Sequence, residues 1–306
     1  MNFTSMEYFL AVAGSRSITR AAEELHITQQ TLSAHIAALE KELAAQLIVR
    51  SNPLELTYAG EVFLRHASGI YDSYQSMWNE FNDLTENQRG KLLVGIDYTR
   101  SRTLMPQVVT AFKAVYPNIE VRIVEGVTRD IQRALISKDI DLAISRFPES
   151  MTGVEILPYY REEVVMLVPP QLNYCGNIKS THYLKNLSEF RNYPFLLGSR
   201  NDIAGQLGHA MLDAAPFKPT IIAQSNNIET LLELCVQGLG VCFAPKSALK
   251  SILGEARLKE MRVFHFTEDT SYPIRFAFRK TAYQWNMISE FIRIALEERE
   301  SMFLAN

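Results

Sequence analysis

The spacing of hydrophobic residues changes twice along the chain and divides it into three segments. In residues 29–43, apolar side chains recur every three or four positions, at Leu32, Ile36, Leu39 and Leu43, which predicts an amphipathic helix. In residues 63–84 the intervals alternate between four and three, which predicts a longer helix with a heptad seam. After Gly90, short apolar runs alternate with helical stretches. The chain therefore combines a small helical segment, a long helix and an α/β region.

Two short helices joined by a tight turn are predicted near the start of the chain. Thr19 is placed to cap the first helix, whose small apolar face contains Ala22 and Leu25, and Thr28 is placed to cap the second. The exposed face of the second helix carries small and amide side chains, a pattern that lets a helix approach base edges in the major groove. This helix-turn-helix pattern favours DNA binding, and an ordinary solvated helix pair is the alternative.

A short hairpin is predicted directly after the second helix. Residues 46–50 and 54–57 are its two strands, and residues 51–53 are the turn. Arg50 lies at the tip, where its guanidinium group could reach backbone phosphates or the minor groove; a solvated turn arginine is the alternative. The candidate DNA contacts are Thr19, Thr28, Gln29, Gln30, Thr31, Ser33, Ala34, Lys41 and Arg50.

The charge of this segment argues for more than one copy on DNA. Between residues 1 and 57, the four basic side chains are outnumbered by six glutamates. Because release of counterions from phosphates supplies most nonspecific affinity, a single copy is expected to bind DNA weakly and with a shallow salt dependence. Helix N-termini, hydroxyl groups and further copies of the segment have to supply the rest.

The long helix is predicted to run from residue 58 to residue 88. Thr57 is its N-cap, no proline occurs before Arg89, and 1.5 Å per residue gives a length of ~40 Å. Packing on a neighbouring domain is one alternative, but so regular a seam favours pairing with a second copy, which would bring two recognition helices to two half-sites. The seam consists of Phe63, Ala67, Ile70, Tyr74, Met77, Phe81 and Leu84.

Eight short strands are predicted beyond residue 89, with helices between many of them. Alternation of this kind predicts parallel sheets covered by helices. Because about 215 residues exceed the size of one compact lobe, two α/β lobes are expected. The strands are Leu92–Ile96, Glu120–Val124, Asp141–Ser145, Glu163–Val168, Phe195–Leu197, Thr220–Ala223, Val241–Ala244 and Ile274–Arg279.

Loops that follow the strands are the expected ligand site, because ligands of open α/β sheets bind outside the carboxyl ends of the strands. Each hydroxyl group in these loops, taken alone, is more typical of helix capping. The loop arginines suit an anionic ligand such as a carboxylate, although solvated loop arginines are the commoner alternative. The candidates are Thr99, Arg100, Ser101, Arg102, Thr103, Thr128, Arg146, Ser199, Arg200 and Asn226.

The first sixty residues resemble the winged helix of the LysR-type transcriptional regulators. Gln30 and Ala44 depart from the family pattern, which usually has Pro and Gly at these positions, and residues 51–53 lack a basic residue that is common there. The matching residues are, in order, Phe9, Ala21, Ala22, Leu25, Gln29, Ser33, Ile36, Leu39, Glu40, Leu43, Arg50, Leu56, Thr57, Ala59 and Gly60.

The resemblance covers the whole chain and implies a fold. It implies an α/β protein with an N-terminal winged helix-turn-helix in residues 1–57, a linker and dimerisation helix in residues 58–88, and an effector-binding domain in residues 89–306. The effector-binding domain would consist of two α/β lobes similar to periplasmic solute-binding proteins. Lobe I would comprise about residues 89–161 and 270–306, and lobe II about residues 162–269, with crossings near 160–163 and 266–272.

The resemblance also implies partners. Effectors of this family contact the first loop and the loop across the cleft, which supports Thr99, Ser101, Thr103, Thr128 and Ser199. The expected partners are a double-stranded DNA operator with an imperfect palindrome, a small-molecule effector, a second copy of the chain in a dimer or dimer of dimers, and RNA polymerase.

Composition fits an intracellular globular protein, with 47% hydrophobic and 21% charged residues. The N-terminus lacks a secretory signal and no apolar run is long enough to span a membrane, so a cytoplasmic location is expected. Cys175, Cys235 and Cys242 have neither disulfide nor metal spacing. The apolar neighbours of Cys235 and Cys242 predict buried thiols rather than redox sensors.

The sequence contains no recognisable catalytic constellation. Its six histidines are scattered, and neither a nucleophile elbow nor a phosphate-binding glycine loop occurs. The sequence therefore predicts an effector-controlled DNA-binding regulator that is not an enzyme and has no metal or cofactor. A constitutive DNA-binding regulator is the main alternative, and a cysteine-based redox sensor is a weaker one.

Overall fold

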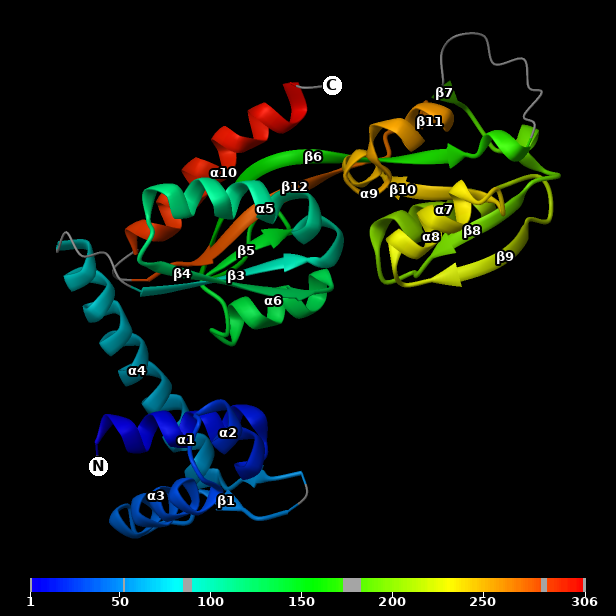
Figure 1. Ribbon diagram of the computed structural model, residues 1–306. Coiled ribbons are helices and arrows are strands. Elements are labelled where there is room, and N and C mark those ends of the chain that lie inside the picture. The colour runs from blue at the N-terminus through cyan, green and yellow to red at the C-terminus, as the bar shows by residue number, and fades with distance from the viewer. Residues whose placement is uncertain (1, 52, 85–89, 173–182, 282–284, 305–306) are drawn as a thin grey trace. The chain divides into compact units, whose positions relative to one another are not determined.

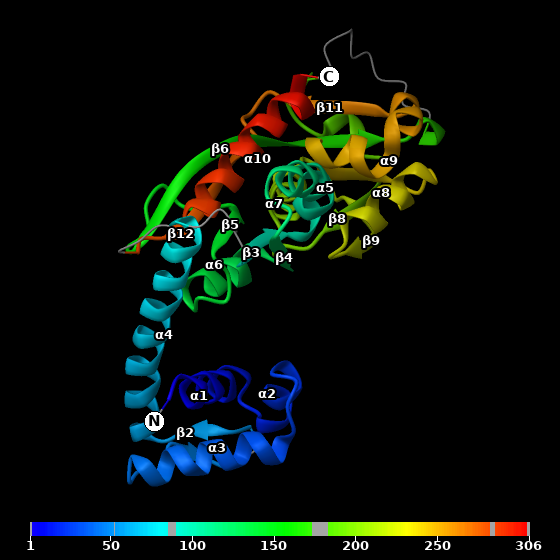
Figure 2. The same ribbon diagram turned by 60° about the vertical axis from the view of Figure 1, so that its left-hand side comes forward.

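A computed structural model describes residues 2–51, 53–84, 90–172, 183–281 and 285–304 (Figures 1 and 2). The chain separates into two compact units, Met1–Glu86 and Asn87–Asn306. None of the helices in the described residues combines the length and the apolar character that crossing a bilayer requires.

The first unit combines short helices, a two-stranded hairpin and one long helix. One apolar core, which includes Phe9, Val12, Leu32, Ile36 and Leu39, joins the short helices. The elements are α1 (Phe3–Ser15), α2 (Ile18–Glu24), α3 (Gln29–Glu42), β1 (Ile48–Val49), β2 (Glu55–Leu56) and α4 (Tyr58–Leu84).

The predicted helix-turn-helix is confirmed, but the residue that caps α2 and the residue that ends α3 differ from the prediction. Ser17 rather than Thr19 caps α2, because the helix begins at Ile18 and Ser17 Oγ accepts a hydrogen bond from the backbone N–H of Arg20 at 3.3 Å. Thr28 caps α3 as predicted. Leu43 was expected in the core but follows the last residue of α3 and is 38% exposed.

The hairpin is held against α3 by one carboxylate. Glu40 Oε1 accepts hydrogen bonds from the backbone N–H groups of Leu47, at 2.7 Å, and Ile48, at 3.1 Å. Ile48 then pairs with Leu56 in antiparallel register, as the sequence predicts. The turn before the hairpin contains Ala44 at a φ of 49°, in the left-handed region. A side chain with a Cβ costs roughly 1–2 kcal/mol there, so this position favours glycine, which is the usual residue in the family that the sequence resembles.

Helix α4 carries an apolar stripe that is open to solvent. It runs over 27 residues, and Thr57 caps it as predicted, because Thr57 Oγ1 accepts from the N–H of Gly60 at 3.0 Å. Ala67 is buried at the start of the predicted seam, whereas three residues further along are exposed. We call these three the distal seam: Ile70 (43% exposed), Met77 (44%) and Phe81 (56%). The side chain of Leu84 lies outside the described residues.

The second unit is built on one continuous path of strands. The order is β4-β3-β5-β12-β6-β10-β8-β9, and β11 pairs with β6 and β7. The strands are β3 (Gly90–Asp97), β4 (Ile119–Gly126), β5 (Leu142–Ser145), β6 (Val154–Val168), β7 (Tyr183–Leu184), β8 (Pro194–Gly198), β9 (Thr220–Ser225), β10 (Val241–Pro245), β11 (Arg262–Phe266) and β12 (Ser271–Arg279). The helices are α5 (Tyr98–Val115), α6 (Thr128–Ile136), α7 (Ile203–Asp213), α8 (Ile228–Val236), α9 (Lys246–Glu260) and α10 (Asn286–Leu304), with short 3-10 turns at Pro170–Leu172 and Ser188–Phe190.

Each of the eight predicted strands has a counterpart, but the expectation of parallel sheets holds only in part. Strand β3 is parallel to β4 and β5, and β8 is parallel to β9 and β10. Strands β6 and β12 pair antiparallel with each other and with their other neighbours. The reason is that β6 and β12 are neighbours in the middle of the strand order, and the chain runs through them in opposite directions. Strands β7 and β11 were not predicted.

Strand β6 joins two groups of strands, which we call the first lobe (β3, β4, β5, α5, α6, α10) and the second lobe (β8, β9, β10, α7, α8, α9). Residues 154–163 of β6 pair with β12, and residues 164–168 pair with β10 and β11. Figure 1 shows α5 and α10 on one side of the first lobe's sheet and α6 on the other. Strands β6 and β12 run from this lobe toward the second, so they form its connection to the second lobe.

Candidate functional sites

The exposed face of α3 presents amide and small side chains. Gln29, Gln30 and Ala34 are exposed in its first two turns, and Lys41 is exposed near its end. Glutamine can form two hydrogen bonds with adenine, and small residues allow a helix to sit deep in the major groove. This face therefore has the chemistry of a base-reading surface.

Hydroxyl groups at the start of α3 are already engaged in capping. Thr28 Oγ1 accepts from the N–H of Thr31 at 3.1 Å, and the two threonine hydroxyl groups lie 2.8 Å apart. Both residues are exposed, and Ser33 is half-buried. Thr19 is exposed inside α2, and Arg50 is exposed just after β1. Hydroxyl groups and a guanidinium in these positions suit contacts with phosphates more than with bases.

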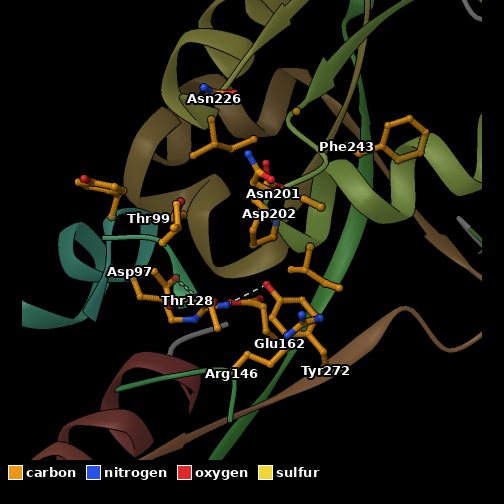
Figure 3. Close-up of a pocket in the computed structure, with 18 of the residues that line it drawn as sticks. Asp97, Thr99, Thr128, Arg146, Glu162, Asn201, Asp202, Asn226, Phe243 and Tyr272 are labelled. Carbon is orange, nitrogen blue, oxygen red and sulfur yellow. Dashed lines mark hydrogen bonds and ion pairs between the residues drawn. The ribbon is translucent and has the colours of Figure 1, made fainter. Parts of the chain in front are cut away.

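A pocket of about 130 Å³ lies between the two lobes of the second unit (Figure 3). Its walls include the first residues of four helices: Tyr98 and Thr99 at α5, Thr128 at α6, Ile203 at α7 and Ile228 at α8. Helices α5 and α6 belong to the first lobe and α7 and α8 to the second. Free backbone N–H groups and the helix dipole make each such end favourable for negative charge.

Arg100 is a buried cation at the floor of this pocket. It is 6% exposed, forms an ion pair with Asp97, and donates from Nη2 to the hydroxyl group of Tyr272 at 2.9 Å. Burial lowers its pKa, but Tyr272, Tyr160 and Glu162 raise it more, so the pKa lies above the usual value and the side chain stays charged.

The ion pair extends into a chain of hydrogen bonds within the first lobe. Ser145 Oγ donates to Asp97 Oδ2 at 3.0 Å and lies 3.1 Å from Thr128 Oγ1. Figure 3 shows Asp97 and Thr128 close together on one side of the pocket. The start of α6 is thereby linked to Arg100 and, through Arg100, to Tyr272 on β12.

Glu162 is a buried carboxylate on β6 that faces the second lobe. It is 3% exposed and accepts hydrogen bonds from both the backbone N–H and the hydroxyl group of Ser247, in the first turn of α9. Asp202 caps α7, with Oδ1 accepting from the N–H of Gly205 at 2.7 Å. Both carboxylates thus lie at N-termini of helices of the second lobe, where the dipole compensates part of their charge.

Arg146 is the pocket cation whose charge is least compensated. Asp97 neutralises Arg100, whereas the side chain of Arg146, half-buried at the end of β5, makes no ion pair with any residue that the structure describes. Its backbone carbonyl accepts from Gln132 Nε2 at 3.0 Å, which fixes the loop. As far as the described residues show, the pocket therefore offers a ligand one available guanidinium, that of Arg146, together with four helix N-termini.

The structure brings five of the ten predicted effector residues to the pocket. Thr99, Arg100, Thr128, Arg146 and Asn226 line it. The other five were placed by their position in the same loops, but their side chains lie elsewhere.

The reasons differ among these five. Ser101 and Arg102 line a groove outside the pocket. Thr103 Oγ1 donates to the carbonyl of Arg100 at 3.0 Å. Ser199 Oγ accepts from the N–H of Asn201 at 3.1 Å. Both hydroxyl groups are therefore hydrogen-bonded to nearby backbone groups. Arg200 pairs with Asp213 at 3.2 Å.

Sequence reasoning missed several lining residues of the pocket, among them Glu162, Phe243 and Tyr272. Glu162 and Tyr272 lie on β6 and β12, which connect the lobes, rather than in a loop after a parallel strand. The signal for Glu162 is an acidic residue at the edge of a strongly apolar strand, because buried carboxylates are rare without a partner. Tyr272 has no comparable signal.

Two of the three cysteines are buried. Cys235 and Cys242 are each 0% exposed. Burial raises the pKa of Cys235 to about 12 and the pKa of Cys242 well above its usual value. Cys175 lies outside the described residues. The environment of Cys235 and Cys242 therefore gives no support to a redox sensor built on this pair.

We expect Cys235 and Cys242 to resist an aromatic disulfide reagent at pH 8 in the native protein and to react after unfolding in guanidinium chloride. With a pKa of about 12, only about one thiol in 10⁴ is a thiolate at that pH. In a Cys175→Ser variant, the native protein should release no chromophore within minutes. Rapid release by that variant would instead support the redox alternative.

Comparison with known proteins identifies the family. A profile described as the LysR substrate binding domain matches residues 85–300. A second, described as the bacterial regulatory helix-turn-helix protein of the lysR family, matches residues 3–61. The chain belongs to the LysR family. It is therefore a transcriptional regulator with a DNA-binding domain and an effector-binding domain, as the sequence predicts.

Known sequences and structures match this LysR regulator over most of its length. The uncharacterized HTH-type transcriptional regulator YcgK of Bacillus subtilis (strain 168) is 30% identical over 267 residues, 80% of each chain. Full-length OxyR from Pseudomonas aeruginosa has a TM-score of 0.69 at 23% identity, covering 98% of this chain and 95% of OxyR. Full-length CbnR in complex with its target DNA has a TM-score of 0.58 at 22% identity, covering 97% and 99%. These two structures confirm the predicted fold class.

Proposed function

We propose that this LysR regulator binds its operator as a homodimer or dimer of dimers, with α3 in the major groove and the hairpin beside it. The exposed distal seam supports pairing through α4, and the exposed amides of α3 support base readout. Full-length CbnR, which shares this fold, forms a complex with its target DNA. The proposed contacts are Thr19, Thr28, Gln29, Gln30, Thr31, Ser33, Ala34, Lys41 and Arg50.

The proposed effector is a small anion, such as a carboxylate, that binds in the pocket between the lobes. The observation that carries this proposal is the convergence of four helix N-termini on a small pocket in which Arg146 has no acidic partner among the described residues. A ligand that contacts both lobes favours one lobe arrangement and can shift the geometry of the oligomer on DNA. The chain would act in the cytoplasm, with RNA polymerase as a further partner.

Footprinting on DNA upstream of the gene tests the function as a whole. Purified protein should protect a site with two half-sites, and one carboxylate from a panel of metabolites should change the extent of protection. A site that no metabolite alters would favour the constitutive regulator. Failure to protect any upstream site would contradict the proposed DNA contacts.

Arg146→Ala is expected to reduce the thermal stabilisation by the active carboxylate to less than half. The reason is that the guanidinium makes a charge-assisted bond to the ligand, worth about 1.5–3 kcal/mol, or roughly 10- to 100-fold in affinity. Differential scanning fluorimetry with a titration of the carboxylate measures it. Arg200→Ala is the matched control, because the sequence nominates both arginines and the structure pairs Arg200 with Asp213 outside the pocket. Equal losses in both variants would contradict the assigned pocket.

Gln29→Ala is expected to weaken operator binding by about 5- to 100-fold without changing the melting temperature. Gln29 is exposed at the first position of α3, and a bidentate amide–adenine pair is worth about 1–3 kcal/mol of discrimination. Fluorescence anisotropy with a labelled operator measures the affinity. Gln107→Ala, an exposed glutamine on α5, serves as the control. Unchanged affinity would remove Gln29 from the DNA contacts.

A further inference from the structure

An ion pair spans the two lobes at the mouth of the pocket. Arg102 Nη1 on α5 lies 2.6 Å from Glu229 Oε2 on α8, and the side chains are 47% and 41% exposed. Helix α5 packs on strands of the first lobe and also contacts α9 of the second lobe, whereas α8 packs on strands of the second lobe. The pair therefore joins elements that are connected through the chain only by β6 and the return at β11 and β12.

The pair lies at the junction of the inner pocket with an outer groove. Arg102 and Glu229 both line the outer groove, and the two cavities share four residues: Tyr98, Thr99, Asn226 and Ile228. Glu229 is fixed at the start of α8, where its backbone N–H donates to the Asn227 side chain at 2.8 Å. This bond fixes the backbone of Glu229 beside the residues that the two cavities share, and its carboxylate reaches Arg102 from there.

The position of each charge favours the contact across the lobes. Arg102 lies in the second turn of α5, near a helix N-terminus that disfavours a cation, so a facing carboxylate relieves that interaction. Glu229 lies in the first turn of α8, where a carboxylate is favourable. The sequence suggested that Arg102 contacts the effector, whereas in the structure its guanidinium is occupied by Glu229.

We propose that Arg102 and Glu229 are positioning residues that hold the two walls of the pocket together and set its width before any ligand binds. Exposed pairs are weak, so breaking this one changes the ratio of closed to open lobes by about 2- to 5-fold rather than opening the domain fully. The contribution is sensitive to salt, because the Debye length falls to roughly 3 Å at 1 M ionic strength. Any effect of this pair on effector affinity rests on the proposed function. Its effect on the distance between the lobes does not depend on that function.

Spin-label distance measurements on the full-length protein without effector test the proposal. Labels at Arg129→Cys on α6 and Ala210→Cys on α7, in a Cys175→Ser background and diluted with unlabelled chains, report the distance between the lobes. Arg102→Glu and Glu229→Arg should each increase the fraction of the longer distance about 2- to 5-fold. The double variant Arg102→Glu/Glu229→Arg should return it to within 2-fold of the parent.

Arg133→Glu is the matched control, because Arg133 forms an exposed pair with Asp130 within α6 alone. Its distance distribution should equal that of the parent. The proposal is overturned if Arg102→Glu and Glu229→Arg behave like this control, or if the double variant is more open than either single variant. Because no ligand or DNA enters the measurement, such a result would leave the proposed effector function standing, and a failed metabolite panel would leave this proposal standing.

Discussion

Replacing Arg100 by Met is expected to lower the free energy of unfolding of the effector-binding domain by about 3–5 kcal/mol, the usual cost of leaving a buried charge without its partner. Arg100 is 6% exposed and its partner Asp97 has a side chain only 16% exposed, so water cannot replace the guanidinium fully. The Tyr272 hydroxyl group would also lose the donor at 2.9 Å. For a domain of this size, the melting temperature should fall on the order of 10 °C. Scanning calorimetry of the full-length protein measures both quantities.

A second substitution separates the buried charge from the loss of packing. In Asp97→Asn/Arg100→Met no carboxylate remains without its partner at this position, so the double variant should recover more than half of the lost stability. Arg133→Met, which breaks an exposed pair with Asp130, should change stability by at most about 1 kcal/mol. A double variant that is less stable than Arg100→Met would show that Asp97 acts through Ser145 rather than through the ion pair.

The parts of the fold that follow from the sequence are those with a strong local pattern. The spacing of Leu32, Ile36 and Leu39 decides which face of α3 is buried, and Thr28 and Thr57 are recognisable caps because each precedes an uninterrupted helical pattern. Thr19 was the wrong cap because Ser17 and Thr19 are both good capping residues two positions apart, and only the backbone geometry of the turn distinguishes them.

The pocket could be predicted as a set of loops but not as a set of side chains. The rule for the ends of parallel strands nominates loops that do line the pocket, since the rule depends only on strand order. Whether a loop side chain points into the pocket depends on its own hydrogen bonds. Ser199 and Arg146 illustrate this, because the Ser199 hydroxyl group serves the backbone N–H of Asn201 whereas Arg146 lines the pocket.

Side-chain contacts between residues far apart in the sequence are the feature of the site that the sequence alone does not predict. Arg100 meets Tyr272 across 172 positions of sequence, and Arg102 meets Glu229 across 127. Nothing in the local sequence of either arginine indicates its partner, so the sequence alone predicts a cation that either contacts an anionic ligand or is solvated. Within the described residues, Arg146 alone among the four loop arginines has no acidic partner, so less positive charge is available to a ligand than the sequence suggests.

Placing a charge in the distal seam is expected to separate the dimer and to weaken operator binding by about 10²- to 10⁴-fold, the gain that linking two binding modules provides. Ile70→Glu and Met77→Glu are suitable because both side chains are more than two-fifths exposed in the single chain, so the substitutions leave the core of the unit intact. In a dimer through α4, each would bury a carboxylate against the apolar stripe of the partner helix. Analytical ultracentrifugation measures the mass, and anisotropy with a two-half-site operator measures the affinity.

Ser76→Glu is the control, because it adds the same carboxylate to α4 at a position that, at about 100° per residue, lies on the side of the helix away from the seam. This variant should remain dimeric and bind the operator as the parent does. The seam variants should also retain their melting temperature at low concentration, where the parent is dissociated. If Ile70→Glu and Met77→Glu remain dimeric, the chain pairs through another surface. The acidic DNA-binding unit would then have to gain its affinity from a different arrangement of its copies, because a single copy has too few cations to bind DNA tightly.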